Sequence, residues 1–416
     1  MPKRVVYNNV FKWAFWAIEG NGPYGKIVKR MNIQQKLKQI EEQGLKRELI
    51  YLDRSGADVV HKGKRYLNFS SNDYLNFAAD TRLKDNAKNS IDKWGIGATG
   101  SRLMSGSLEP HKRLEEKISQ WLGYKSALVF GSGFLTNLGL ISALCQANDI
   151  VLFDKLDHAS LIDGIRMSGA KWKRYKHKNT NDLERLLEQY NNVQERIFII
   201  TDSVFSMDGD IAPVKEISKL AKKYNAILIV DEAHAIGIFG EKGAGICNEQ
   251  KIKPDIITGT LSKALGSYGG FAVFSKEIEQ LCVNKARSFI YSTALPAVCA
   301  ATGEKAIDII QEEKVLGEEL LKKAKMFYGK IQKAGFDLLP FESQVIPVMI
   351  GDNDKTLKFT QALLEEELFV KAIRPPTVPK GTSRVRLSIT LAHTKEELEK
   401  ALEIIVRVGR GMGIIA

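Results

Sequence analysis

The sequence predicts an α/β protein, with a large domain built on a mostly parallel sheet between helices and a smaller α+β domain at the C-terminal end. From residue 126 onwards, short apolar runs alternate with segments of helical periodicity. The apolar runs end in small or polar residues, as buried strands do in a sheet that helices cover on both faces. Right-handed crossovers then place the carboxyl ends of the strands at one edge, where ligands bind.

The strands and helices of the large domain are expected in the following order. Five apolar runs are expected as strands, at residues 126–131, 149–154, 196–202, 226–234 and 255–263. Helical spacing of apolar residues marks residues 183–193 and 214–225 between them. Asp202, Asp231, His234 and Lys263 all fall at strand ends, so a functional site is predicted there.

The pattern changes after about residue 300. A long helical stretch over 298–335 precedes strand candidates at 344–351 and 384–390, and a closing helix begins at 394. We therefore expect an N-terminal extension with a small segment over 1–75, a large cofactor-binding domain over 76–305 and a C-terminal α+β domain over 306–416.

Composition argues against several classes of protein. The formal net charge of +12 invites a nucleic-acid interpretation, but basic and acidic residues are interleaved along amphipathic segments. The four cysteines form no C-x-x-C pair, which fits a reducing cytoplasm and excludes a zinc ribbon. We expect a cytoplasmic protein with no metal site. A basic surface also favours an acidic acyl carrier such as coenzyme A.

The stretch "LIVDEAHAIG" contains a DEAH sequence beside a strand, as nucleic-acid helicases do. A nucleotide motor also needs a glycine-rich loop that ends in G-K-S or G-K-T, because its lysine reaches the phosphates. No G-K-S or G-K-T occurs in the chain. The helicase hypothesis fails for this reason.

The same stretch suits pyridoxal phosphate, which needs a lysine for its aldehyde, an acid for its pyridine nitrogen, an anion cradle and a stacking partner. Asp231 is the candidate for the pyridine nitrogen, and His234 can hydrogen-bond the phenolic oxygen of the ring. Taken alone, this pair could instead be an aspartate that caps a helix and a histidine whose ring nitrogens have ordinary hydrogen-bond partners.

The candidate anion cradle is "FGSGFLTN", residues 130–137, between a strand and a helix. The backbone N–H groups of Gly133 and Phe134 would lie at the helix start, where unpaired donors and the helix dipole favour a phosphate. Thr260 and Ser262 flank the lysine and offer hydroxyl groups to the same phosphate. A G-x-G turn before a helix is often only a turn.

The remaining candidates are a stacking ring, a hydroxyl and the lysine itself. His158 follows a strand and can stack on the cofactor, and Ser206 can reach its phenolic oxygen. The alternative for His158 is an ordinary surface or core histidine, and the alternative for Ser206 is a serine in a turn. Lys263 lies among small residues in "SKALGSYGG", which leaves room for a Schiff base, and the nearby pyridinium lowers its pKa.

Together these motifs resemble the α-oxoamine synthases of the fold-type I pyridoxal-phosphate superfamily, over residues 33–409. The motifs that carry the resemblance are "SSNDYLN", "SGSLEPHKRLEEKI", "DHASLIDG", "FSMDGDIAP", "DEAHAIGIFG", "TGTLSKA" and "IYSTALP". The resemblance implies homodimeric enzymes, with the active site at the subunit interface, that condense an amino acid with an acyl thioester and release carbon dioxide. It assigns Lys263 to the Schiff base, Asp231 to the pyridine nitrogen and His158 to stacking. It assigns Gly133, Phe134 and Thr260 to the phosphate, and Ser206 and His234 to the phenolic oxygen. Ser292 or Thr293 would bind the phosphate of the cofactor in the partner subunit.

The substrate region follows from the same resemblance. Arg386 matches the arginine that binds the amino-acid carboxylate, and Arg374, Thr377 and Arg47 match residues that line the substrate site. The run "IRPPTVP" is similar to members that join L-alanine to a pimeloyl thioester, carried by coenzyme A or acyl carrier protein, in biotin biosynthesis. Members that use glycine with acetyl-CoA, or serine with a long acyl chain, are the alternatives.

Residues 1–30 lie outside the resemblance, and their apolar run is shorter than the ~20 residues that a membrane span needs. They also lack the small-residue cleavage site of a signal peptide. An amphipathic helix built on Phe11, Trp13, Phe15 and Trp16 is the alternative to a dispensable appendage. These aromatic residues do not keep to one narrow helical face.

We predict that a chain starting at Met31 keeps its dimer, cofactor and activity, because terminal appendages usually add little to a core. Thermal stability and liposome binding of the two chains test this. A large loss of stability on truncation, or liposome binding by the full chain alone, would contradict it.

Overall fold

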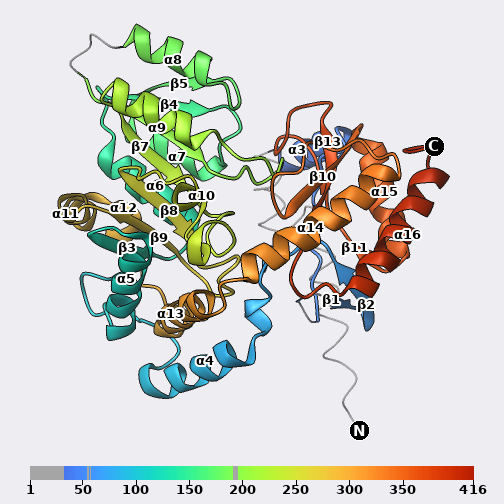
Figure 1. Cartoon of the computed structure of the whole chain (residues 1–416), viewed down its shortest axis with the longest axis horizontal. Helices are drawn as coiled ribbons and strands as arrows, with labels where there is room; N and C mark the ends of the chain where they lie inside the picture. Colours follow the sequence, from blue (N-terminus) through green and yellow to red (C-terminus); the bar gives the residue numbers. More distant parts are fainter. Residues whose placement is uncertain (1–31, 54–55, 57, 191–194) are drawn as a thin grey trace.

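The protein folds into two lobes, which Figure 1 shows in a computed structural model that describes residues 32–53, 56, 58–190 and 195–416. The larger lobe contains a seven-stranded sheet in the order β3-β9-β8-β7-β6-β4-β5. Its strands are β3 (Ser126–Phe130), β4 (Ile150–Asp154), β5 (Lys171–Tyr175), β6 (Ile197–Asp202), β7 (Ile227–Asp231), β8 (Ile256–Thr260) and β9 (Gly270–Phe274). Residues 1–31, and with them the predicted appendage, lie outside the described residues.

The sheet is mostly parallel, as predicted. Strands β5, β4, β6, β7 and β8 pair in parallel, and β9 runs antiparallel to both of its neighbours, β8 and β3. The expected strands match β3, β4, β6, β7 and β8. The edge strand β5 carries no apolar run, since four of its five side chains are exposed, and sequence reasoning did not single it out. It also passed over β9, which follows the glycine-rich turn after Lys263.

Helices cover both faces of the large sheet, which explains why its strands are continuously apolar. In β6, Ile197 and Ile199 belong to one apolar cluster, and Phe198 and Ile200 belong to the cluster on the other face. The helices of this lobe are α4 (Thr81–Trp94), α5 (Glu109–Leu122), α6 (Gly133–Leu144), α7 (Ala159–Ser168), α8 (Thr180–Gln189), α9 (Val214–Lys223), α10 (Ile246–Glu249), α11 (Lys276–Lys285), α12 (Arg287–Ile290) and α13 (Ala297–Glu312), with 3-10 turns η1 (Phe77–Ala79) and η2 (Glu241–Gly243).

Helix α14 (Leu316–Lys333) leads from the large lobe into the small one (Figure 1). The long helical stretch expected over 298–335 consists of two helices, α13 and α14, because the α-helical conformation is interrupted at residues 313–315. The small lobe adds β10 (Val345–Gly351), α15 (Asn353–Glu365), β11 (Leu368–Phe369), β12 (Ala372–Ile373), β13 (Ser383–Ser388) and α16 (Lys395–Gly411). Its main sheet has the order β10-β13-β12.

The N-terminal part of the described chain packs with the small lobe. Strands β1 (Asp58–His61) and β2 (Lys64–Asn68) form a sheet with β11, in which β2 and β11 are parallel. Helix α3 (Ile33–Glu42) lies on the same side of the molecule (Figure 1). The domain boundaries at residues 75 and 305 stay a prediction.

Two other findings concern the described residues as a whole. No helix in these ranges is both long enough and apolar enough to cross a membrane. The four cysteines are free thiols, and three of them (Cys145, Cys247 and Cys282) are buried.

The start of α14 generates a stability prediction. A Cβ atom on Gly317 would lie 1.9 Å from the carbonyl oxygen of Ile238, in the loop that follows β7. Gly317→Ala therefore forces the helix away from the large lobe, and we expect it to lower the free energy of unfolding by about 1–3 kcal/mol. Urea unfolding measures this loss.

Gly329 is the matched control in the same helix, because nothing lies within 4 Å of a Cβ atom placed there. Gly329→Ala should leave stability unchanged or raise it by up to about 1 kcal/mol, through helix propensity. Equal effects of the two substitutions would contradict the packing described for α14.

Candidate active site

The amine of Lys263 lies at the carboxyl edge of the large sheet, three residues after β8 ends. Its Nζ atom is 2.8 Å from Nε2 of His234. Burial lowers the pKa of Lys263 to about 8, against the opposing effect of Asp231 and Asp202. Because its pKa is lowered, Lys263 is deprotonated near neutral pH much more often than an ordinary lysine, and the neutral amine is the nucleophile.

Asp231 ends the neighbouring strand β7, and its carboxylate is held in place by two donors. Oδ2 accepts a hydrogen bond from the side-chain amide of Asn137 at 2.6 Å, and Oδ1 accepts one from the backbone of Ala233 at 2.8 Å. Asn137 lies on α6 and also donates to Ser160 on α7 at 2.9 Å. The carboxylate is thus fixed between the two helices that follow β3 and β4.

His234 connects the lysine to the small lobe. Its Nδ1 atom is 2.8 Å from the hydroxyl of Tyr74, and Tyr74 donates to Asn72 at 3.0 Å. These bonds are satisfied together when Nε2 accepts from the lysine and Nδ1 carries the proton. Burial lowers the pKa of His234 well below its usual value, and the nearby Lys263 adds to this, so the ring stays neutral.

Arg386, on β13 of the small lobe, completes this chain of contacts. It donates to the hydroxyl of Tyr74 at 3.1 Å and to the backbone oxygen of Ser206 at 2.6 Å. Its guanidinium also donates to Asn72 and Ser388. Arg386 is only 7% exposed, yet no carboxylate among the described residues forms an ion pair with it. A buried cation without a counter-charge is a site for an anionic ligand.

His158 is the N-cap residue of α7 and is positioned by a buried pair of aspartates. Its backbone N–H donates to Asp202 at 2.7 Å, and the backbone of Asp202 donates to Asp157 at 2.9 Å. Nδ1 of His158 is 2.7 Å from the hydroxyl of Ser160. Burial and the proximity of other carboxylates raise the pKa of both aspartates well above the usual value. Asp157 also accepts a hydrogen bond from the backbone N–H of Asp154, so backbone donors tie the loop after β4 to the end of β6.

The stretch predicted as an anion cradle forms the turn from β3 into α6. Gly133 is the first residue of this helix, and a Cβ atom on it would lie 3.3 Å from Cβ of Thr260. The turn after β8 is therefore brought against the helix N-terminus. Thr260 and Ser262 both donate to the backbone oxygen of Gly269, so these hydroxyls also hold the turn itself. Phe134 is 41% exposed beside the cradle.

These groups fit pyridoxal phosphate. The fixed carboxylate of Asp231 and the amine of Lys263 follow the neighbouring strands β7 and β8, and Thr260 at the end of β8 lies against the start of α6. Within the DEAH stretch, two residues face the site and one holds the surrounding structure in place. Asp231 and His234 face the site, while the buried Glu232 accepts hydrogen bonds from Ser203, Ile246 and Cys247 and so holds the following loop.

A pocket of about 540 Å³ opens beside this centre. His158 and Ser206 line it from the large lobe, and Thr377 lines it from the loop after β12. Arg47 donates to the hydroxyl of Thr377 at 3.2 Å, and Arg374 donates to the backbone oxygens of Gly44 and Lys46. Arg47 and Arg374 do not line the pocket. In the structure Arg374 holds the N-terminal segment against the loop.

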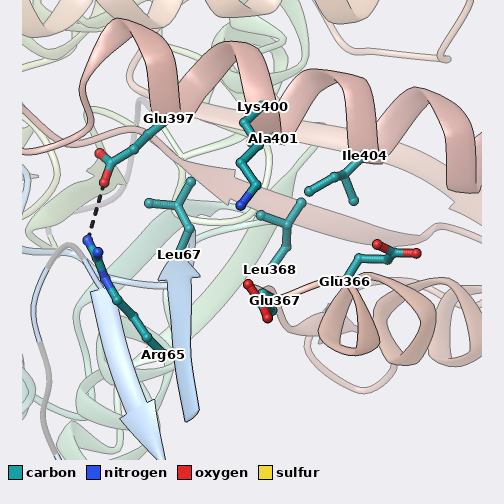
Figure 2. Close-up of a pocket in the computed structure, with 9 residues that line it drawn as sticks. All are labelled: Arg65, Leu67, Glu366, Glu367, Leu368, Glu397, Lys400, Ala401 and Ile404. Atoms are coloured by element: carbon teal, nitrogen blue, oxygen red, sulfur yellow. Dashed lines mark hydrogen bonds and ion pairs between the residues drawn. The ribbon is translucent and has the colours of Figure 1, made fainter.

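A second, smaller pocket lies away from this centre (Figure 2). It is formed by β2, the turn before β11 and helix α16, with Arg65 bonded to Glu397 across its mouth. None of the residues predicted for the site lines it.

Sequence reasoning passed over two residues of the centre. Asn137 lies inside the quoted stretch 130–137, one helical turn beyond Gly133, and that spacing places both on one face of α6. Tyr74 lies inside "SSNDYLN", but no strand or helix periodicity links it to His234. The first residue could have been found from the helical spacing, whereas the second needed the tertiary fold.

Comparisons with known proteins agree with this geometry. The chain is 41% identical over 389 residues to the 8-amino-7-oxononanoate synthase of Geobacter sulfurreducens, which covers 92% of this chain and 99% of that protein. A serine palmitoyltransferase from S. paucimobilis, solved with a bound PLP–myriocin aldimine, matches with a TM-score of 0.88 and 29% identity, over 93% of this chain and 99% of that one. The 8-amino-7-oxononanoate synthase of Francisella tularensis matches with a TM-score of 0.71 and 28% identity, over 84% and 99%. Residues 64–405 match the aminotransferase class I and II family, and the chain belongs to that family.

Proposed function

We propose that this protein is an 8-amino-7-oxononanoate synthase, a pyridoxal-phosphate-dependent acyltransferase of biotin biosynthesis. It condenses L-alanine with a pimeloyl thioester, and releases carbon dioxide and the thiol of the acyl carrier. The observation that carries the proposal is the lysine amine 2.8 Å from His234 at the carboxyl edge of the sheet, joined through Tyr74 to the buried Arg386. The named relative that covers 92% of the chain supports the choice of reaction.

The chain's own residues would hold the cofactor from several sides. The start of α6, at Gly133 and Phe134, and the hydroxyl of Thr260 would take its phosphate. Asp231 would pair with the pyridine nitrogen and His158 would stack on the ring. Ser206 and His234 would address the phenolic oxygen. When bound there, pyridoxal phosphate supplies an electron sink for the carbanion of the amino acid.

The protein's part in the reaction is binding, orientation and proton transfer. Arg386 would bind the alanine carboxylate with its planar fork, which orients the Cα–H bond. The amine of Lys263, with its lowered pKa, would accept the Cα proton near neutral pH. His158 faces the pocket and would stabilise the oxygen of the thioester carbonyl. Thr377 would line the acyl side of the site, while Arg47, bonded to Thr377, and Arg374, bonded to the N-terminal segment, would support it without lining it.

The alternatives are other α-oxoamine synthases, of the glycine C-acetyltransferase or serine palmitoyltransferase type. The solved serine palmitoyltransferase matches the fold more closely than the Francisella enzyme does, with TM-scores of 0.88 and 0.71. A nucleic-acid-binding protein is a remote alternative, suggested by charge alone. We propose a cytoplasmic homodimer. Exposed apolar side chains, among them Phe134 in α6 and Tyr268 in the turn before β9, support a subunit interface.

A matrix of amino acids and acyl donors tests the function. We expect thiol release with L-alanine and a pimeloyl thioester, and at least about 100-fold less with glycine and acetyl-CoA or with serine and palmitoyl-CoA. Lys263→Ala should abolish both turnover and the yellow absorbance of the enzyme with its cofactor. Fast turnover with glycine or serine and none with alanine would overturn the assignment, and full turnover by Lys263→Ala would overturn the mechanism.

Arg386→Lys tests the carboxylate site. We expect the KM for alanine to rise about 10- to 100-fold, because a lysine cannot reproduce the two-pronged contact. The KM for the pimeloyl thioester is the internal control and should change less than about twofold. An equal rise of both KM values would show that Arg386 supports the fold of the site rather than the amino acid.

A further inference from the structure

The pocket beside His158 has two cations on its rim. Lys155 directly follows β4, and Arg174 lies on the edge strand β5, next to Phe153 in the register of the sheet. Both side chains are exposed. The guanidinium of Arg174 lies over the ring of Trp172, 5.9 Å from its centroid, and this contact helps to hold it at the edge of the sheet.

The charges of this pocket are unbalanced. Among the described residues, no carboxylate forms an ion pair with Lys155 or Arg174. Asp208 also lines the pocket but is bonded to Arg384 at 2.6 Å. Asp157 is buried beside Asp202, which raises its pKa and favours its neutral form. The rim therefore attracts anions.

Apolar side chains form much of the wall of this pocket. Its walls include Leu156, Ile162, Phe205, Met207 and Val378. A cavity of about 540 Å³ accommodates an acyl chain or a pantetheine arm, but not the nucleotide of coenzyme A as well, nor a carrier protein. The carrier must therefore remain outside, and its arm must cross the rim.

We infer that Lys155 and Arg174 bind the phosphate at the solvent end of the pantetheine arm of the acyl donor. This inference rests on the proposed function, because it assumes that a thioester carbonyl is delivered to the centre near His158. The phosphate is the anion that both coenzyme A and an acyl carrier protein place at the outer end of this arm. Arginine and lysine are the usual ligands of such a group.

The test uses the holoenzyme and the double variant Lys155→Gln/Arg174→Gln. Coenzyme A binding is measured by calorimetry, and kcat/KM is measured with pimeloyl-CoA and with the phosphate-free thioester of N-acetylcysteamine. We expect the variant to bind coenzyme A about tenfold more weakly, and the preference for pimeloyl-CoA over the phosphate-free donor to fall about tenfold. Lys173→Gln is the matched control, since Lys173 is exposed on the same strand but does not line the pocket.

The outcomes separate this inference from the proposed function. Unchanged coenzyme A binding and an unchanged donor preference in the double variant would overturn the phosphate site, even if the enzyme makes 8-amino-7-oxononanoate. An equal loss with both donors would also overturn it, because the cations would then act on the acyl chain. Weaker coenzyme A binding without any turnover of alanine would support the phosphate site and contradict the function. Pimeloyl-acyl carrier protein is tested as a further acyl donor. A loss of kcat/KM with this donor as well shows that the shared phosphate is recognised. A loss confined to pimeloyl-CoA contradicts recognition of the shared group.

Discussion

The contact between Lys263 and His234 is the interaction on which the rest of the site depends. Through Tyr74 it continues to Arg386, so a single chain of hydrogen bonds joins β8 and the loop after β7 to β13 of the other lobe. The amine and the guanidinium are thus held in one frame, although they belong to different lobes. A site that must bind an amino-acid carboxylate and take a proton from the adjacent carbon needs this fixed separation.

Burial supplies the electrostatics of this chain. Desolvation lowers the pKa of both Lys263 and His234, so His234 stays neutral and Lys263 loses its proton more readily than an ordinary lysine, beside the permanently charged Arg386. On the opposite side, the carboxylate of Asp231 is fixed by Asn137. The site therefore has a negative wall, formed by the carboxylate of Asp231 on the large lobe, and a positive wall, formed by the guanidinium of Arg386 on the small lobe. A ligand with a protonated ring nitrogen and a carboxylate matches both walls.

The sequence predicted the large sheet well because its central strands are buried on both faces and read as continuous apolar runs. It missed β5 because an exposed edge strand such as "KWKRY" carries no apolar run. The predicted centre of Lys263, Asp231, His234, His158 and Arg386 comes from strand ends and a family resemblance, and the structure brings these residues close to one another. Tyr74 could not be predicted, because its contact with His234 spans 160 residues. For the same reason, sequence could not show that Arg374 donates to the backbone of the N-terminal segment.

The central claim is that Lys263 is the amine that takes the aldehyde of pyridoxal phosphate. The most direct measurement is borohydride reduction of the enzyme with its cofactor, followed by peptide mass spectrometry. We expect a phosphopyridoxyl group on Lys263 and on no other lysine. Modification of a different lysine, or a Lys263 peptide that remains unmodified while the cofactor is fixed elsewhere, would contradict it.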